Sequence, residues 1–167
     1  MTAMAEPTFL VDINVGDLTK WLRAMGYDAV CLPHASDAEL IGRALADGRV
    51  LLTRDAEIAR RRVVSTGRVR TLLLGPQDLM HRLRLVAGEV GLDSEGRAFT
   101  ICLECNQRLR DRPKESVREV VPAYVFRTQE SFKDCPACGR VYWQGTHWAR
   151  MRRVMADVAP DRQGAPQ

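Results

Sequence analysis

Four cysteines constrain this chain more than any other feature of its sequence. They form two C-x2-C pairs, Cys102 with Cys105 and Cys135 with Cys138, and 29 residues separate the pairs. Cys31 makes the total odd, and the spacing is not that of a disulfide framework in a small secreted domain. Four thiolates in two close pairs satisfy the tetrahedral preference of Zn²⁺. We therefore expect a closed structural zinc site, with reduced core cysteines as the alternative.

The segments around these cysteines are short, so we expect a thin core whose folding energy comes largely from the metal. Residues 98–101, 124–127 and 141–143 have the composition of strands, and residues 146–158 that of a final helix. We expect residues 160–167 to form a frayed tail. Cys31 lies in an apolar run and is expected to be a core residue.

The first 95 residues alternate short apolar runs with segments of helical periodicity. Runs at residues 9–11, 28–32, 50–53 and 69–74 predict strands, and helical patterns follow each of them. This order predicts an α/β fold with a parallel sheet covered by helices on both faces. Residues 91–96 are the expected linker, which divides the chain into domains at residues 1–95 and 96–167.

Three acids follow the predicted strands at or near their carboxyl ends: Asp12, Asp37 and Asp55. Because the carboxyl ends of parallel strands meet at one rim, these side chains are expected to converge. Converging carboxylates bind hard cations such as Mg²⁺ or Mn²⁺, which can activate water and hold the oxygens of a phosphodiester. Asn14 and Thr53 are neutral oxygen groups that could orient a carboxylate or a water molecule there.

Each acid also has a purely structural interpretation. Asp55 is placed to cap the helix that follows it, and Asp12 could cap the turn at Asn14. Asp37 complements the dipole of its helix, and Glu39 completes a capping box with the preceding serine. The pattern alone leaves both interpretations open.

Composition and charge narrow the class of protein. Of 167 residues, 46% are apolar and 28% charged, which excludes a largely disordered chain. No apolar run approaches the ~20 residues of a membrane helix, and residues 1–7 lack a secretory pattern, so we expect a cytoplasmic protein. Residues 1–95 carry a net charge of −1 and residues 96–167 one of +5. The basic half favours a polyanion partner, with a solvated basic surface as the alternative.

The basic half also contains aromatic residues, which can stack on unpaired bases while Arg and Lys neutralise phosphate. These residues are Arg108, Arg110, Arg112, Lys114, Trp143, His147, Trp148, Arg150, Arg152 and Arg153. On the final helix we expect Trp148, Met151 and Met155 to face the core and Arg150 and Arg153 to face solvent. For His147 a structural hydrogen bond is the alternative to a role at the site.

Many of these residues stand in an order that resembles a known family. Phe9-Leu10-Val11-Asp12, with Gly16, Leu18, Trp21-Leu22-Arg23 and Gly26-Tyr27-Asp28, resembles the opening of the Mut-seven C-terminal ribonuclease domain family. The resemblance continues through Asp37-Ala38-Glu39-Leu40, Leu51-Leu52-Thr53-Arg54-Asp55, Cys102-x2-Cys105-Asn106, Val121-Pro122, the run from Cys135 to His147, and Arg150-Met151. It covers about residues 9–155, and the zinc half, with its run at 142–147, is its most specific part.

This resemblance implies a PIN-like nuclease core, a parallel sheet flanked by helices, followed by a small zinc ribbon. It also implies metal-dependent cleavage of RNA, with Mg²⁺ or Mn²⁺ at Asp12, Asp37 and Asp55. Asn14, Glu39, Thr53 and Arg54 are the supporting positions that it carries over. The sequence departs from the family's usual pattern at Asn14 and Asp17.

We therefore expect a ribonuclease, with transfer RNA among its candidate substrates. The residues expected to contact RNA are Arg54, Arg140, His147 and Arg150. One alternative is a non-catalytic zinc-ribbon module that binds RNA or protein. Another is a toxin-like ribonuclease that needs a protein inhibitor.

Overall fold

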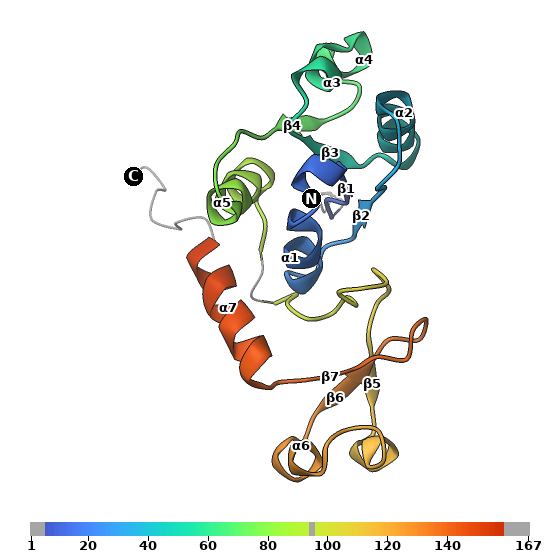
Figure 1. The fold of residues 1–167 in the computed structure, drawn as a ribbon, viewed down its shortest axis with the longest axis vertical. Coiled ribbons are helices and arrows are strands. Elements are labelled where there is room, and N and C mark those ends of the chain that lie inside the picture. Colours follow the sequence, from blue (N-terminus) through green and yellow to red (C-terminus); the bar gives the residue numbers. More distant parts are fainter. Residues whose placement is uncertain (1–5, 94–95, 159–167) are drawn as a thin grey trace, which may run out of the picture.

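A computed structural model of the protein describes residues 6–93 and 96–158, and its elements form two sheets (Figure 1). The first sheet is parallel, with the order β2-β1-β3-β4, and the second is antiparallel, with the order β5-β6-β7. The strands of the first are β1 (Phe9–Val11), β2 (Ala29–Cys31), β3 (Val50–Thr53) and β4 (Thr71–Leu73). The predicted parallel α/β architecture is thus confirmed. The expected frayed tail and part of the expected linker, residues 94–95, lie outside the described residues.

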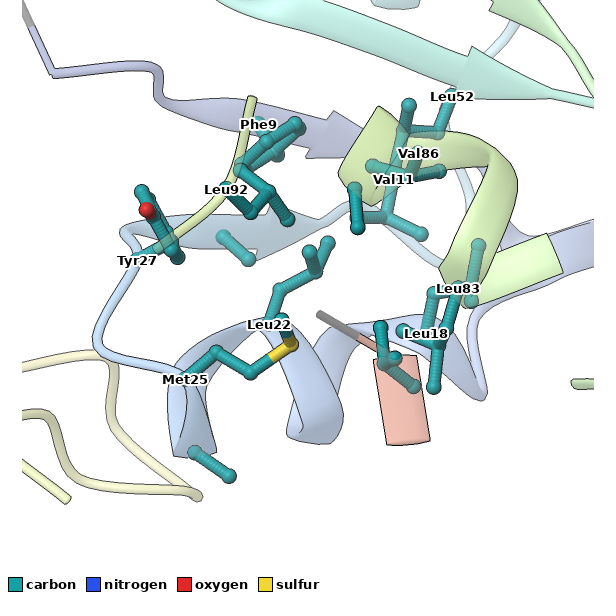
Figure 2. Close-up of a cluster of buried hydrophobic side chains, with 14 of the residues drawn as sticks. Phe9, Val11, Leu18, Leu22, Met25, Tyr27, Leu52, Leu83, Val86 and Leu92 are labelled. Atoms are coloured by element: carbon teal, nitrogen blue, oxygen red, sulfur yellow. The ribbon is translucent and has the colours of Figure 1, made fainter. Parts of the chain in front are cut away.

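Helices cover both faces of the parallel sheet because neighbouring residues of a strand point to opposite sides. The helices of this half are α1 (Leu18–Ala24), α2 (Asp37–Asp47), α3 (Ala56–Arg60), α4 (Arg62–Ser65) and α5 (Leu79–Val90). Phe9 and Val11 pack on one face with side chains of α1 and α5, as Figure 2 shows. Leu10 and Leu51 pack on the other face with α2 and Ile58 of α3. Both central strands, β1 and β3, are fully buried, which explains their uninterrupted apolar sequences.

The helix α2 begins with the capping box that the sequence predicts. Ser36 Oγ accepts a hydrogen bond from the Glu39 N–H, and a Glu39 carboxylate oxygen accepts one from the Ser36 N–H at 2.8 Å. This capping box satisfies two N–H groups that the helix itself cannot pair. The helix ends at Gly48, whose φ of 64° is one that L side chains rarely adopt.

The second sheet differs from the sequence-based expectation. Its strands are β5 (Arg110–Arg112), β6 (Phe132–Asp134) and β7 (Val141–Trp143), so the strand predicted at 141–143 is confirmed. The strand predicted at 98–101 is wrong, because these residues form turns with one isolated bridge, from Ile101 to Arg108. The chain instead leaves the edge of the first domain here, and the Phe99 N–H donates to the Ala24 carbonyl.

The strand predicted at 124–127 is also wrong, since this segment is the helix α6 (Ala123–Thr128). Pro122 precedes the helix, where its missing N–H costs nothing. Val117, Val121 and Val125 recur at four-residue spacing and bury their side chains against Phe132. Tertiary packing has therefore overridden the strand propensity of a segment rich in aromatic and β-branched residues.

The final helix, α7 (Thr146–Val158), packs against α5 of the first half. Met151 and Met155 are buried in the same apolar cluster as Leu83, whereas Arg150 and Arg153 are exposed, as predicted. Trp148 is only half-buried. The two halves of the chain thus share one core cluster, and a division at residues 95 and 96 stays a prediction.

A polar clamp fastens the first cysteine pair to the edge of the parallel sheet. The Asn106 side chain donates to Asp28 Oδ1 at 2.6 Å and accepts from the Ala29 N–H at 3.0 Å. Arg23 donates to the carbonyls of Leu103 and Glu104, at 2.8 and 3.0 Å. The clamp satisfies backbone groups at the open edge of β2, where an unpaired strand would otherwise recruit another chain.

We expect Asn106→Gly to lower the free energy of unfolding by about 1–3 kcal/mol, because a hydrogen bond to a charged group and one to a backbone N–H are lost. Asn106 has a φ of 60°, so Asn106→Ala should cost a further ~1 kcal/mol of left-handed strain. Urea unfolding of the zinc-loaded protein measures both. Gln107→Ala, at the exposed neighbouring side chain, is the control. Wild-type stability of Asn106→Gly would show that the clamp contributes nothing.

Candidate functional site

The four cysteines of the C-x2-C pairs come together as the sequence predicts. Their Sγ atoms all lie within 4.8 Å of one another, and those of Cys102 and Cys138 are 3.8 Å apart. The Cys105 N–H points at Cys102 Sγ at 3.4 Å, which is the turn that a C-x2-C pair requires. In the second pair, Gly139 takes a φ of 73° and its N–H donates to the Cys135 carbonyl at 2.9 Å. The cluster therefore fits a structural zinc ion.

The protonation behaviour of the cluster also suits a cation. Burial opposes ionisation of Cys102, but hydrogen bonds from the Tyr142 hydroxyl and from the N–H groups of Cys105 and Glu104 lower its pKa to about 7. Cys105 shows the opposite shift, because its contact with Cys138, burial and the nearby thiolates raise its pKa to about 12. Without a positive charge Cys105 thus resists ionisation beside its neighbours, and Zn²⁺ would remove that repulsion.

Two of the three predicted acids are linked at the rim of the parallel sheet. Thr53, the last residue of β3, donates its hydroxyl to Asp12 Oδ2 at 2.6 Å and accepts from the Asp55 N–H at 3.0 Å. The Asp12 N–H donates to the Leu52 carbonyl at 2.9 Å, which extends the pairing of β1 with β3 past the strand end. One buried hydroxyl therefore fixes the side chain of one acid and the backbone of the other.

Asp12 is buried, with 7% of its surface exposed, yet within the described residues it forms no ion pair. Two other acids, Asp17 and Asp37, differ from Asp12 because each has a basic partner. Asp17 makes a two-point ion pair with Arg82, at 3.2 and 2.7 Å, and Asp37 lies 3.9 Å from Arg61. Buried carboxylates are ordinarily paired with a base or a metal ion, so Asp12 stands out among them. Its negative charge adds to the effect of burial in raising the pKa of the Cys31 thiol.

The structural interpretations of the other acids are realised as well. Asp55 Oδ1 caps α3 by accepting from the Glu57 N–H at 2.8 Å, and the Glu39 carboxylate is held by Ser36. In the described part of the chain, the cysteine cluster is the one group of three or more His, Cys, Asp or Glu side chains gathered closely enough for a common ion. Asp12, Asp37 and Asp55 are not gathered in this way, so a cation shared by these three acids stays a prediction.

The residues expected to contact RNA are exposed and lie in both halves of the chain. Arg54 follows Thr53 at the rim, where its N–H donates to Asn14 Oδ1 at 3.1 Å. Arg140 lies in the loop after the last cysteine, and His147 and Arg150 lie on α7. Figure 1 shows α3 and α4 at one end of the long axis and the β5-β6-β7 sheet at the other. Arg54 belongs to the first half, directly before Asp55, the N-cap of α3, whereas Arg140, His147 and Arg150 belong to the second half.

Comparison with protein families gives the observation that decides the family. The family model described as the Mut7-C RNAse domain matches residues 7–155, which is nearly the whole chain. The chain belongs to the Mut7-C RNAse domain family. Comparisons with curated proteins and with solved structures found no match. The resemblance seen in the sequence is thus confirmed, and this Mut7-C domain is a ribonuclease-like enzyme whose substrate class is RNA.

Two features of this Mut7-C domain escaped the sequence analysis. The first is the clamp made by Arg23 and Asn106. Asn106 directly follows the cysteine at position 105, and an amide side chain there could have indicated a hydrogen bond from the turn to a neighbouring backbone. Tyr124 was expected in a strand, and α6 instead presents it to solvent with 63% of its surface exposed. No helix among the described residues has the length and apolarity that a bilayer span requires.

Proposed function

We propose that this Mut7-C domain hydrolyses RNA phosphodiester bonds with the aid of Mg²⁺ or Mn²⁺ held at the rim of its parallel sheet. The observation that carries the proposal is the Asp12 carboxylate, which is buried, oriented by Thr53, and without a basic partner within the described residues. A hard divalent cation would supply the missing positive charge. The side chains proposed to hold it, Asp12, Asp37 and Asp55, offer carboxylate oxygens, which are the ligands that such a cation prefers. Membership of an RNAse family gives the substrate class.

The residues at the rim have distinct roles in this proposal. Asp12 and Asp55 would hold the cation, and Asp37 would exchange its distant Arg61 contact for it. When bound, the cation would activate water and neutralise charge on the scissile phosphate. Asn14 accepts from the Arg54 N–H and so holds the backbone of Arg54, whose exposed guanidinium can contact a substrate phosphate.

The basic half would hold the substrate. Arg140, His147 and Arg150 are exposed on it, and residues 96–167 carry a net charge of +5. Contacts of Arg and Lys with phosphate depend on salt and carry no sequence information, so we propose single-stranded or structured RNA rather than one sequence.

The test is cleavage of end-labelled unstructured RNA and of labelled transfer RNA by zinc-loaded protein, with Mg²⁺ or Mn²⁺ added or withheld. We expect cleavage only when one of these cations is present. A chelator is unsuitable for this comparison, because it would also remove zinc. Equal cleavage with and without added cation, by protein shown to lack both ions, would overturn the metal-dependent proposal.

We expect Thr53→Val to lower the cleavage rate by roughly 10- to 100-fold, as is typical when a residue that orients a metal ligand is lost. Valine matches the buried shape of threonine but removes the hydroxyl that Asp12 and Asp55 share. Thr53→Ser keeps that hydroxyl and should keep most of the activity. The readout specific to orientation is the Mn²⁺ concentration at half-maximal rate, which should rise for Thr53→Val alone. An unchanged rate and unchanged Mn²⁺ dependence would remove Thr53 from the site.

A further inference from the structure

A cavity of about 380 Å³ lies between the β5-β6-β7 sheet, α6 and the start of α7, away from the rim acids. Its walls include the aromatic side chains of Phe99, Tyr124, Trp143 and Trp148. The volume falls within the range of about 300–1,000 Å³ that is typical of small-molecule sites. Neither the zinc cluster nor the proposed cation site accounts for it.

The aromatic walls are set in place by the local backbone. Phe99 has a φ of 59°, which a bulky residue rarely adopts, and its ring lies against Trp148 with the ring centroids 5.1 Å apart. A Cβ added to Gly145 would lie 3.0 Å from Trp143 Nε1, so a side chain at this turn would crowd the indole. Strained backbone that persists in a fold marks positions that are held by their surroundings.

Tyr124 is the wall residue that packing explains least. It has 63% of its surface exposed, although its helix α6 buries Val125 against the core of the module. Polar side chains also line the cavity, including Gln144, Ser131 and His147, and these can donate to or accept from the edge of a planar ligand. The cavity therefore combines flat apolar faces with hydrogen-bonding groups at their edges.

The charge around the cavity identifies a class of occupant. Lys133 lines it together with Asp111, with which it forms an ion pair at 2.7 Å, so the cation nearest the rings without that pairing is Arg152, which lies over the Trp148 ring at 5.0 Å. Residues 96–167 carry a net charge of +5. Aromatic faces inside a basic surface suit single-stranded nucleic acid, because bases stack on the rings while the backbone phosphates meet the basic side chains. A protein segment that is merely apolar would not need this charge.

We infer that this cavity takes an unpaired base of single-stranded RNA, with Tyr124 as a stacking platform. This inference rests on the proposed function for the origin of the RNA, but it concerns binding and not cleavage. The cavity would hold a stretch of substrate at a distance from the cleaved bond, and this favours RNA with an unpaired segment over a fully paired duplex.

The test compares two strands of about eight nucleotides and equal charge, one of intact RNA and one whose nucleotides are all abasic. Fluorescence anisotropy with the zinc-loaded Asp12→Asn protein gives both affinities, and strand integrity is checked after each measurement. Stacking of one base predicts that the intact strand binds roughly 5- to 100-fold more tightly. Tyr124→Leu keeps an apolar side chain but should lose most of this advantage, whereas Tyr124→Phe keeps the ring and should retain it. Val120→Ala, at an exposed residue that does not line the cavity, should bind like the parent protein.

Equal affinity of the parent protein for the intact and abasic strands would overturn the inference and favour an apolar protein segment as the occupant. An advantage for the intact strand that Tyr124→Leu leaves unchanged would also overturn it, because the base would then stack elsewhere. Failure of the proposed function has a different signature. In that case the Asp12→Asn protein still cleaves RNA, while the dependence of binding on Tyr124 is measured independently.

Discussion

We expect Asp12→Asn to lower the rate of RNA cleavage by roughly 10²- to 10³-fold, the scale seen when a group that stabilises charge in the transition state is removed. Asparagine has the shape of aspartate, and its amide oxygen can still accept the hydrogen bond from Thr53 Oγ1. The substitution therefore removes the negative charge and little else. The measurement is the initial rate with saturating Mg²⁺ or Mn²⁺, beside circular dichroism and zinc content.

The matched control is Asp47→Asn, which removes the same charge from an exposed residue at the end of α2. Among the described residues Asp47 pairs with the exposed Arg43 and, at 3.5 Å, with Arg49, and neither lies at the proposed cation site, so this variant should keep wild-type activity. Undiminished cleavage by Asp12→Asn, with contaminating nuclease excluded, would remove Asp12 from the catalytic site. The protein would then be better described as an RNA-binding module stabilised by zinc.

We expect Cys135→Ser to unfold the β5-β6-β7 module and to reduce zinc content to near zero. Cys135 is buried, and apparent zinc-binding free energies of about 10–16 kcal/mol in small structural sites match or exceed the stability of a whole domain. The apolar cluster of this module is small, with four buried members: Val117, Val121, Val125 and Phe132. Unfolding of the module is measured by limited proteolysis between residues 106 and 134, and the zinc content is measured in the same sample.

Cys31→Ala is the control for this variant, because Cys31 packs against the core of the first half and lies outside the cysteine cluster. It should bind one zinc ion per chain and resist proteolysis like the wild type. Resistance of Cys135→Ser to proteolysis, together with retained zinc, would contradict a structural role for the four thiolates. The variant is preferable to a chelator, since a chelator would also withdraw the cation proposed at the rim.

The local features of this fold were predictable where neighbouring residues decide them. The C-x2-C pairs predicted the cysteine cluster, and the serine and glutamate at the start of α2 predicted its capping box. Uninterrupted apolar runs predicted β1 and β3, because a strand buried on both faces needs apolar side chains on both.

The elements that were missed, such as β5, or misassigned, such as α6, lie where distant residues decide the structure. The strand β5 has the polar sequence Arg110–Arg112, and its pairing with β6 is supported by the ion pair of Arg110 with Asp134 at 2.7 Å. The same contact holds the pKa of Asp134 below its usual value, against the effect of burial. In α6, packing against Phe132 outweighed strand propensity. Neither pairing partner lies in the window that a sequence pattern can use.

The sequence by itself determined the family, the four candidate zinc ligands as a spacing pattern, and the set of acids that could face a common rim. Only the tertiary structure decided which acids find a basic partner among the described residues. Asp17 finds Arg82 65 positions further along the chain, while Asp12 meets a threonine hydroxyl from β3. The reason is that the partner of a buried carboxylate is set by the packing of separate elements, which no local pattern encodes.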